Sequence, residues 1–287
     1  MDLAAFMQAK AEKTEAALAR YVDGWEDVPA PLLEAMRYSL FAGGKRLRPT
    51  LALGAAEIVS GTDDTALPVA CALEMIHTYS LIHDDLPAMD DDDLRRGKPT
   101  CHKAFGEATA ILAGDGLLTM AFDVAAETGS IAIVRELARA AGVAGMVGGQ
   151  QADLAGEGQQ LGLDALRRIH RAKTGALIRA SARCGALAAG GDAPAVDALT
   201  AYGEHLGLAF QITDDILDVT GTEAAIGKPV GSDVSRDKST YPALLGLDES
   251  RRLAAEAVDA ALAALSAFGA AAEHFRDLAR YILDRRS

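Results

Sequence analysis

Apolar residues recur with helical spacing along almost the whole chain. Alanine, leucine, glutamate and arginine dominate the long segments, whereas alternating runs of β-branched residues are scarce. Prolines at Pro31 and Pro68 suit first helical turns, and glycines at Gly61 and Gly190 suit helix ends. The pattern predicts an all-α fold with helices over residues 3–20, 31–42, 47–60, 66–86, 107–127, 131–148, 164–189, 194–219, 239–246, 250–266 and 270–284.

Several of these helices are apolar nearly all round. Residues 109–126 are an example, and such a helix is expected inside a large bundle rather than on its surface. No tandem repeat or low-complexity linker divides the chain, so one all-α domain is expected over residues 1–287. Two connecting segments, 91–103 and 221–238, are rich in glycine or charge and are expected to be mobile loops.

The overall composition narrows the classes of function. Of the 287 residues, 50% are hydrophobic, enough for a large core, and the net charge is −13. An acidic chain is a poor match for nucleic acid or for an anionic membrane surface. The three scattered cysteines form no CxxC pair, which predicts a reducing, cytoplasmic environment. The chain start does not read as a signal peptide, and no transmembrane helix or stable membrane insertion is expected.

Two aspartate-rich motifs, each behind an apolar helix, carry the chemistry. Crowded carboxylates repel one another, so a cation is expected to hold them together. Oxygen-only ligands select a hard ion, and Mg²⁺ is usually bound by a few carboxylates together with substrate phosphates. Solvated acidic helix ends are the plainer interpretation, but basic residues near both motifs favour a metal site. The motifs comprise Asp84, Asp85 and Asp90, and then Asp214, Asp215 and Asp218.

Helix geometry places these aspartates differently in the two motifs. Asp214 and Asp218 are four residues apart and therefore share a helix face. Asp84 and Asp90 are six apart, which puts them on different faces of an ideal helix, and Pro87 forbids a regular helix there. The first motif must therefore end or distort its helix and bring Asp90 back toward Asp84.

Basic residues suited to diphosphate binding lie in three places. Residues 43–49 open a helix at a glycine turn and carry three cations, and Arg95 and Arg96 follow the first acidic motif. Lys173 lies beside Thr174 on an otherwise alanine-rich helix. Each signal alone is weak, because a glycine turn with surface cations is common and Lys173 could simply be partly exposed.

Taken in order, these motifs resemble the bacterial short-chain trans-isoprenyl (polyprenyl) diphosphate synthases, and among them most nearly the farnesyl diphosphate synthases. The similarity covers about residues 30–247, and the first acidic motif has the longer of the family's two forms, with four residues between its aspartate pair and Asp90. The matching segments are 43–49, 74–97, 146–150, 173–177, 210–218, 227–228 and 238–242.

The resemblance implies the isoprenoid-synthase fold, an α-helical bundle around a deep central cavity, usually as a homodimer. It implies a Mg²⁺-dependent condensation in which three ions hold an allylic diphosphate between the two acidic motifs. Loss of diphosphate gives an allylic carbocation, which the double bond of isopentenyl diphosphate attacks, and loss of a proton completes the product.

The resemblance also implies a role for each matching residue. The main metal ligands would be Asp84, Asp90 and Asp214, with Asp85 and Asp218 as nearby or water-mediated partners. The allylic diphosphate would be held by Lys173, Arg95 and Lys238, with Lys228 close by. Developing positive charge would be stabilised by the oxygen dipoles of Thr174 and Gln211. Isopentenyl diphosphate would be held without metal by Lys45, Arg48, His77 and Arg96, although His77 also fits a buried structural histidine.

Product length is expected to depend on the residues just before the first motif. Ser80 and Tyr79 are the fourth and fifth residues before Asp84, positions that form much of the cavity floor in this family. A large Tyr79 would stop the tail at C15, although Tyr79 could equally be ordinary core packing. The nearest alternative is a geranylgeranyl diphosphate synthase, which makes C20.

Two alternatives come from other classes of protein. A terpene cyclase would usually carry an Asn/Asp-Ser/Thr-Glu metal motif in place of Asp214–Asp218 and would need no second diphosphate site at Lys45 and Arg48. A non-catalytic subunit of a heteromeric synthase would have lost some of the metal aspartates, whereas all are present here.

Overall fold

The described residues of the computed structural model, 2–221 and 238–284, form a bundle of helices, and the all-α prediction is confirmed. Lys228 and most of the predicted loop 221–238 lie outside the described residues. The helices of the first half are α1 (Leu3–Asp23), α2 (Ala30–Leu40), α3 (Leu47–Ser60), η1 (Asp64–Ala66), α4 (Leu67–Asp84), α5 (Cys101–Phe105), α6 (Glu107–Ala126) and α7 (Ile131–Ala141). Those of the second half are α8 (Met146–Gly156), α9 (Leu163–His170), η2 (Arg171–Gly175), α10 (Ala176–Ala188), α11 (Ala193–Thr220), α14 (Tyr241–Leu245), α15 (Leu247–Ala264), η3 (Ser266–Ala272) and α16 (Glu273–Asp284).

Short-range signals fix many of the helix ends. Pro31 and Pro68 lie in the first turns of α2 and α4, as predicted. Asp192 begins α11 by accepting a hydrogen bond from the Ala195 amide at 2.9 Å. Helix α3 spans the predicted residues and ends at Gly61 in the left-handed conformation.

Two predicted helices are interrupted in the structure. The helix predicted over 131–148 stops at Ala141, and a separate helix, α8, begins at Met146. Between them Gly145 adopts φ −127° and ψ −128°, a conformation incompatible with helix. The helix predicted over 164–189 contains the π-helical turn η2. The prediction missed α8 itself, because its glycines at Gly148 and Gly149 depress helix propensity.

The segment 91–103 is a β-hairpin followed by the start of α5, where the sequence predicted a mobile loop. Strands β1 (Leu94–Arg95) and β2 (Lys98–Pro99) pair antiparallel, with Arg95 opposite Lys98. The two turn residues, Arg96 and Gly97, both have positive φ, at 53° and 76°, which is the geometry of a type I′ turn. The hairpin fixes where Arg95 and Arg96 lie.

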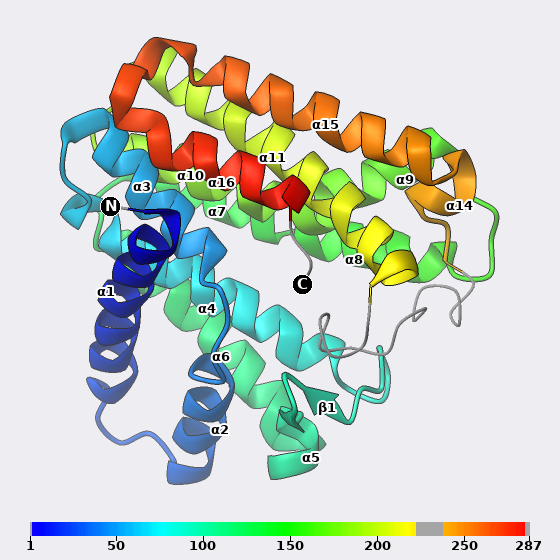
Figure 1. Cartoon of the computed structure of the whole chain (residues 1–287). Helices are drawn as coiled ribbons and strands as arrows, with labels where there is room; N and C mark the ends of the chain where they lie inside the picture. Colours follow the sequence, from blue (N-terminus) through cyan, green and yellow to red (C-terminus); the bar gives the residue numbers. More distant parts are fainter. Residues whose placement is uncertain (1, 222–237, 285–287) are drawn as a thin grey trace.

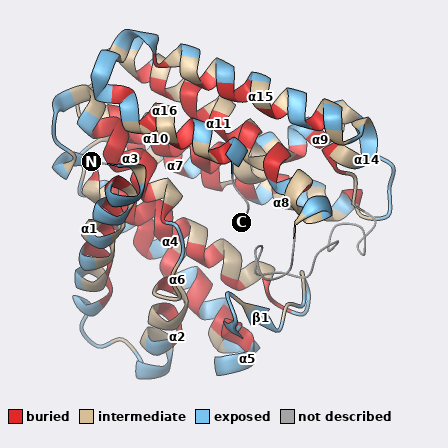
Figure 2. Ribbon diagram, in the orientation of Figure 1, coloured by how far each residue is buried: buried red, intermediate tan, exposed pale blue. Residues whose placement is uncertain are grey.

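The bundle has two main apolar clusters, joined by α3 and α10. One cluster gathers the buried side chains of α1, α2, α4, α6 and α7, and the other those of α11, α15, η3 and α16. Helices α3 and α10 contribute to both, for example through Leu53 to the first and Leu51 to the second. Figure 1 shows the corresponding arrangement, with α11, α15 and α16 along one side of the bundle and α1, α2, α4 and α6 along the other. Figure 2 shows buried residues concentrated where the helices face one another.

By length and composition alone, two helical segments of the described chain could cross a membrane, which the sequence analysis did not foresee. They are Asp64–Asp84 and Glu107–Ala126, and a bent pair, Leu247–Ala264 with Ser266–Asp284, would raise the number to three. Helices α4 and α6 pack against each other within the first apolar cluster. In the first segment the apolar window is 67% buried inside the protein, so core packing accounts for its apolar character.

Candidate active site

The first acidic motif ends α4 and turns back on itself. Asp84 is the last residue of α4, and the Asp90 amide donates a hydrogen bond to the Asp84 carbonyl at 2.8 Å. The Asp91 amide donates to the Leu86 carbonyl at 3.1 Å, which closes the turn around Pro87. The predicted return of Asp90 toward Asp84 is therefore confirmed.

The Asp84 carboxylate occupies a position that disfavours its charge. Burial raises its pKa from 3.8 to about 6, and the neighbouring Asp90 and Asp85 add to the rise. Lys173 acts in the opposite direction and favours the ionised form. A cation near Asp84 and Asp90 would relieve the same penalty, so this pair suits a hard metal ion.

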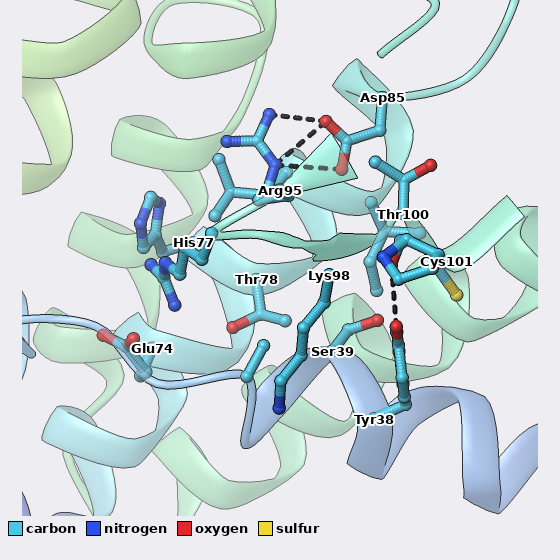
Figure 3. Close-up of a pocket in the computed structure, with 15 residues that line it drawn as sticks. Tyr38, Ser39, Glu74, His77, Thr78, Asp85, Arg95, Lys98, Thr100 and Cys101 are labelled. Carbon is cyan, nitrogen blue, oxygen red and sulfur yellow. Dashed lines mark hydrogen bonds and ion pairs between the residues drawn. The ribbon is translucent and has the colours of Figure 1, made fainter. Parts of the chain in front are cut away.

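Asp85 is committed to a different partner from the other aspartates of the motif. Its carboxylate is buried and accepts hydrogen bonds from Arg95 Nε at 2.9 Å and from Arg95 Nη2 at 2.5 Å. Both carboxylate oxygens take part, as Figure 3 shows. The pair joins the end of α4 to the hairpin, so Asp85 orients Arg95 in this structure rather than presenting free oxygens.

The second acidic motif lies on the last two turns of α11. Asp214 is exposed and Asp218 follows one turn later on the same face, as predicted. Asp215 is buried instead, where it accepts hydrogen bonds from Gln211 Nε2 at 3.1 Å and from the Tyr241 amide at 3.0 Å. The carboxyl ends of α4 and α11 lie toward the same side of the bundle in Figure 1.

Two lysines from distant parts of the chain meet at one carboxylate. Lys173 Nζ, from η2, and Lys238 Nζ, just before α14, lie 2.7 Å and 2.9 Å from Asp153 Oδ2 on α8. The two predicted diphosphate-binding lysines are therefore brought together. The sequence analysis missed Asp153, because α8 was not predicted and a single acidic residue does not indicate its partner.

The π-helical turn that carries Lys173 and Thr174 packs closely on α8. A Cβ atom at Gly149 would lie 2.2 Å from the Lys173 amide nitrogen and 2.6 Å from its Cα. Only glycine permits this approach of two backbones. π-Helical turns often occur at functional sites, and here one displays both Lys173 and Thr174.

The basic loop 43–49 divides its cations between the interior and the surface. Arg46 turns inward at φ 47°, and its guanidinium donates to Glu74 Oε1 at 2.7 Å and to the Leu40 carbonyl at 2.7 Å. Lys45 is exposed, with its Nζ 5.9 Å from the centre of the Tyr281 ring. Arg48 Nε is buried and has no hydrogen-bond partner among the described residues. Arg46 was not singled out in the sequence analysis, and it fixes the loop that carries the other two cations.

The predicted isopentenyl diphosphate residues His77 and Arg96 join this basic region. The Arg96 guanidinium packs over Gly44, where an added Cβ would lie 2.7 Å from its Nη2. Burial lowers the pKa of His77 well below 6.5, and the nearby Arg48 and Arg96 lower it further, so the imidazole is neutral at pH 7.

A small pocket, with a cavity volume of about 40 Å³, lies between α2, α4 and the hairpin. Figure 3 shows Arg95 reaching from the hairpin to Asp85, with His77 and Glu74 further along α4. Arg96 also lines the pocket, whereas Lys45 and Arg48 do not. The Tyr38 hydroxyl donates to the Pro99 carbonyl at 2.8 Å and so ties α2 to the hairpin beside this pocket.

The two residues predicted to set product length lie on α4, before the acidic motif. Tyr79 is 6% exposed and packs edge-on against the His83 ring, with 5.7 Å between ring centres. The Ser80 hydroxyl donates to the His77 carbonyl at 2.8 Å within the helix. Tyr79 belongs to the first apolar cluster, so its packing role is evident from the structure and its role in product length stays a prediction.

Within residues 2–221 and 238–284, no group of three or more histidine, cysteine, aspartate or glutamate side chains is assembled in a form that could hold a metal ion. The oxygen-only donor set of Asp84, Asp90, Asp214 and Asp218 nevertheless fits Mg²⁺, which typically binds one or two carboxylates and completes its shell with water and phosphate. The raised pKa of Asp84 supports the same fit.

The chain belongs to the polyprenyl synthetase family, whose family model matches residues 29–274. It is 53% identical over 264 residues to the farnesyl diphosphate synthase of Geobacillus stearothermophilus, with 89% of each chain covered. It is 49% identical to the large subunit 1 of a heterodimeric chloroplastic geranylgeranyl pyrophosphate synthase of Arabidopsis thaliana, covering 88% of this chain and 71% of that one. The crystal structure of a polyprenyl synthase from Caulobacter crescentus, complexed with calcium and isoprenyl diphosphate, superposes with a TM-score of 0.90 at 32% identity and covers 100% of this chain and 98% of that one.

We predict that Gly149→Ala displaces the lysine-bearing turn. The added methyl would meet the Lys173 backbone at 2.2 Å, so α8 and η2 must separate. Overpacking of this kind costs about 1–3 kcal/mol of unfolding free energy, measurable by denaturant titration. Gly162→Ala is the matched control, because a Cβ there meets nothing within 4 Å. Equal unfolding free energies for the two variants would contradict the close packing described here.

We also predict that Asp84→Asn stabilises the metal-free protein above pH 6. The folded-state pKa of about 6 exceeds the ordinary 3.8, so the folded state binds the extra proton and stability falls as the pH rises between these values. Removing the charge should recover at most about 3 kcal/mol at pH 8 and little at pH 4. Thermal unfolding in EDTA at both pH values measures the difference. A variant less stable than the wild type at pH 8 would show that Asp84 is not under electrostatic strain.

Proposed function

We propose that this protein is a farnesyl diphosphate synthase, a prenyltransferase that joins isopentenyl diphosphate head to tail to dimethylallyl and then geranyl diphosphate. The observation that carries the proposal is that the turn formed by Asp84 and Asp90 lies near lysines from two other elements, Lys173 and Lys238. Lys173 favours the charged form of Asp84, and Asp90 favours the charged form of Lys238, so the acidic and basic groups lie within electrostatic reach. This pattern suits a diphosphate held between metal ions and ammonium groups.

In this proposal Mg²⁺ would be held by Asp84, Asp90, Asp214 and Asp218. When bound, it would neutralise the leaving diphosphate and so favour cleavage of the allylic C–O bond. Ammonium groups at Lys173 and Lys238 donate hydrogen bonds to the diphosphate, as does the Arg95 guanidinium that Asp85 orients. Lys228 would add a further cation. The calcium and isoprenyl diphosphate named for the Caulobacter crescentus structure support a metal and diphosphate site in this family.

Two polar side chains near the reacting carbon would stabilise its positive charge. Thr174 lies next to Lys173 in η2, and Gln211 lies one turn before Asp215 on α11. Because the Gln211 amide donates to Asp215, its carbonyl oxygen remains available as a dipole toward a carbocation.

The second substrate would bind in the basic region around α4. Lys45 and Arg48 supply charge, and the unpartnered buried Nε of Arg48 gains an acceptor when a diphosphate arrives. His77 would act as a neutral hydrogen-bond donor, because its pKa is held well below 6.5. Arg96 over Gly44 completes the group. Isopentenyl diphosphate can thus be held without metal.

A geranylgeranyl diphosphate synthase is the second candidate, because relatives with that name reach 49% identity. The C15 assignment is favoured by the bulk of Tyr79 and by relatives such as the Geobacillus stearothermophilus farnesyl diphosphate synthase.

We further propose a homodimer that works in the cytoplasm. Only 44% of the apolar stretch of helix α6 is buried, and Ile111 and Leu112 are exposed on it. A second copy covering this helix would remove that apolar surface from water. The three cysteines are free and buried, which is compatible with a reducing compartment.

The activity is tested by incubating the protein with isopentenyl diphosphate, geranyl diphosphate and Mg²⁺ and identifying the products by chromatography. We expect farnesyl diphosphate with Mg²⁺, no product in EDTA, and recovery when excess Mg²⁺ is added, because carboxylate sites bind the ion reversibly. Asp214→Ala should lower turnover by orders of magnitude without loss of helicity. Metal-independent condensation, or mainly C20 product, would contradict the proposal.

Product length provides a separate prediction. Tyr79→Ala should shift products from C15 toward C20, because burying each additional CH₂ of a longer tail is favourable by about 0.8 kcal/mol. Tyr21→Ala, which truncates a half-buried tyrosine on α1, is the matched control and should leave product length unchanged. If Tyr79→Ala still makes only C15, then Tyr79 is packing alone and the tail ends elsewhere.

A further inference from the structure

We propose that Asp153 is a positioning residue, which holds Lys173 and Lys238 together as one dicationic group so that both lysines engage the same diphosphate. The inference rests on the proposed function of this site and adds a residue to it. Asp153 lies on α8, whereas the two lysines come from η2 and from the segment that leads into α14.

The geometry is that of a single oxygen shared by two ammonium groups. Asp153 Oδ2 lies 2.7 Å from Lys173 Nζ and 2.9 Å from Lys238 Nζ. The separation of the two lysine nitrogens therefore cannot exceed the sum of these two distances. The side chains are sheltered, with 18% of Asp153, 28% of Lys173 and 15% of Lys238 exposed. Water therefore screens this group less than it would screen a surface ion pair.

Without the carboxylate, two like charges at this separation would repel each other. Burial works against the charged form of Asp153, but the two lysines outweigh it and its pKa falls below 3.8. Conversely, burial disfavours the charge on Lys238, but Asp153, together with the smaller effects of Asp90 and Glu157, outweighs burial and raises its pKa above 10.5. The carboxylate thus keeps the two ammonium groups close together and favours the charged form of Lys238.

Asp153 need not leave when substrate arrives. An ammonium group has three N–H donors, and the bond to Asp153 uses one on each lysine. The remaining N–H donors of both lysines can point to the oxygens of one diphosphate. The two ammonium groups are close enough for this because both already contact one carboxylate oxygen. Asp153 and the two lysines together carry one net positive charge, which Glu157, with its Oε1 3.5 Å from Lys238 Nζ, partly offsets before a diphosphate binds.

The second lysine is also held in place by its surroundings. Ser239 Oγ accepts from the Leu161 amide at 3.1 Å, and the Tyr241 amide donates to Asp215 at 3.0 Å. These contacts fix the backbone on the C-terminal side of Lys238. Asp153 fixes the charged end of the side chain, so the ammonium group is positioned from both ends.

The test is Asp153→Asn, which keeps the side-chain shape and removes the charge. We expect the KM for geranyl diphosphate to rise about tenfold, as is typical for coupled charged groups, and the KM for isopentenyl diphosphate to change less than twofold. The basic limb of the kcat/KM profile for geranyl diphosphate should move to lower pH, because Lys238 loses the carboxylate that raises its pKa. Asp153→Glu, which keeps the charge, should recover part of the loss.

Glu204→Gln is the matched control. Glu204 also pairs with a cation of η2, since its Oε1 lies 2.6 Å from Arg171 Nη2, but that pair is exposed and contains neither lysine. We expect both KM values of this variant to remain within twofold of the wild type. An equal change in both KM values of Asp153→Asn would indicate a general structural role and overturn the proposal.

A binding measurement tests the role of Asp153 independently of whether the protein makes farnesyl diphosphate. Calorimetric titration with inorganic pyrophosphate and Mg²⁺ needs no turnover, and we expect about tenfold weaker binding for Asp153→Asn than for the wild type. Unchanged binding would overturn the positioning role, and tighter binding would show that Asp153 competes with diphosphate for the lysines. Failure of the wild type to make any prenyl product would instead overturn the proposed function, while the pyrophosphate result would still decide the role of Asp153.

Discussion

The constraint on which the site depends is the free-energy cost of gathering charges at one end of a helical bundle. Burial there penalises carboxylates and ammonium groups alike, and the chain meets the penalty by pairing them. Asp85 pairs with Arg95, and Asp153 pairs with two lysines. Asp84 remains the strained member, with its pKa raised to about 6. The paired groups hold their side chains in fixed positions. Binding a cation would relieve the unfavourable electrostatic environment of the Asp84 carboxylate.

The basic side of the molecule is organised by the same principle. Arg46 is 1% exposed in its side chain and would be costly to bury alone, but Glu74 at 4% exposure and the Leu40 carbonyl meet its donors. Glu15 from α1 adds a third oxygen at 2.9 Å. This network closes the loop between α2 and α3 onto α4. The network around Arg46 therefore orders the loop backbone, and Lys45 and Arg48 do not need to contribute contacts of their own to order it.

The sequence predicted what depends on local rules and missed what depends on partners. Helix α3 was predicted over its observed span because an end at Gly61 is a short-range signal. The return of Asp90 to Asp84 followed from Pro87 and the helical period. By contrast, the π-helical turn at Lys173 depends on the close approach of Gly149 on another helix, which no local pattern contains. The hairpin that carries Arg95 was likewise hidden in a charged segment, although its type I′ turn at Arg96 and Gly97 has a recognisable glycine.

Partner choice was the least predictable part of the candidate site. The acidic motif identified Asp84, Asp85 and Asp90 as a group, but only the fold separates Asp85, which is turned toward Arg95, from the other two. Asp153 could not be assigned because its lysines lie 20 and 85 residues away along the chain. A charge in a sequence predicts that a counter-charge exists, and the fold decides which one.

Helix α4 sets the distance between the basic and the acidic groups of the site. His77 and Asp84 are seven residues apart, close to two full turns, so they lie on nearly the same face and about 10 Å apart along the axis. The basic group around His77 and the acidic turn at Asp84 thus lie at two fixed positions along one rigid helix. This arrangement suits the binding of two diphosphates whose reacting carbons must meet between them. Tyr79 lies between them in sequence but is rotated by about 140° from Asp84, toward the apolar core. The helix can therefore fix the distance between two polar groups on one face while an adjacent face limits the space left for an apolar tail.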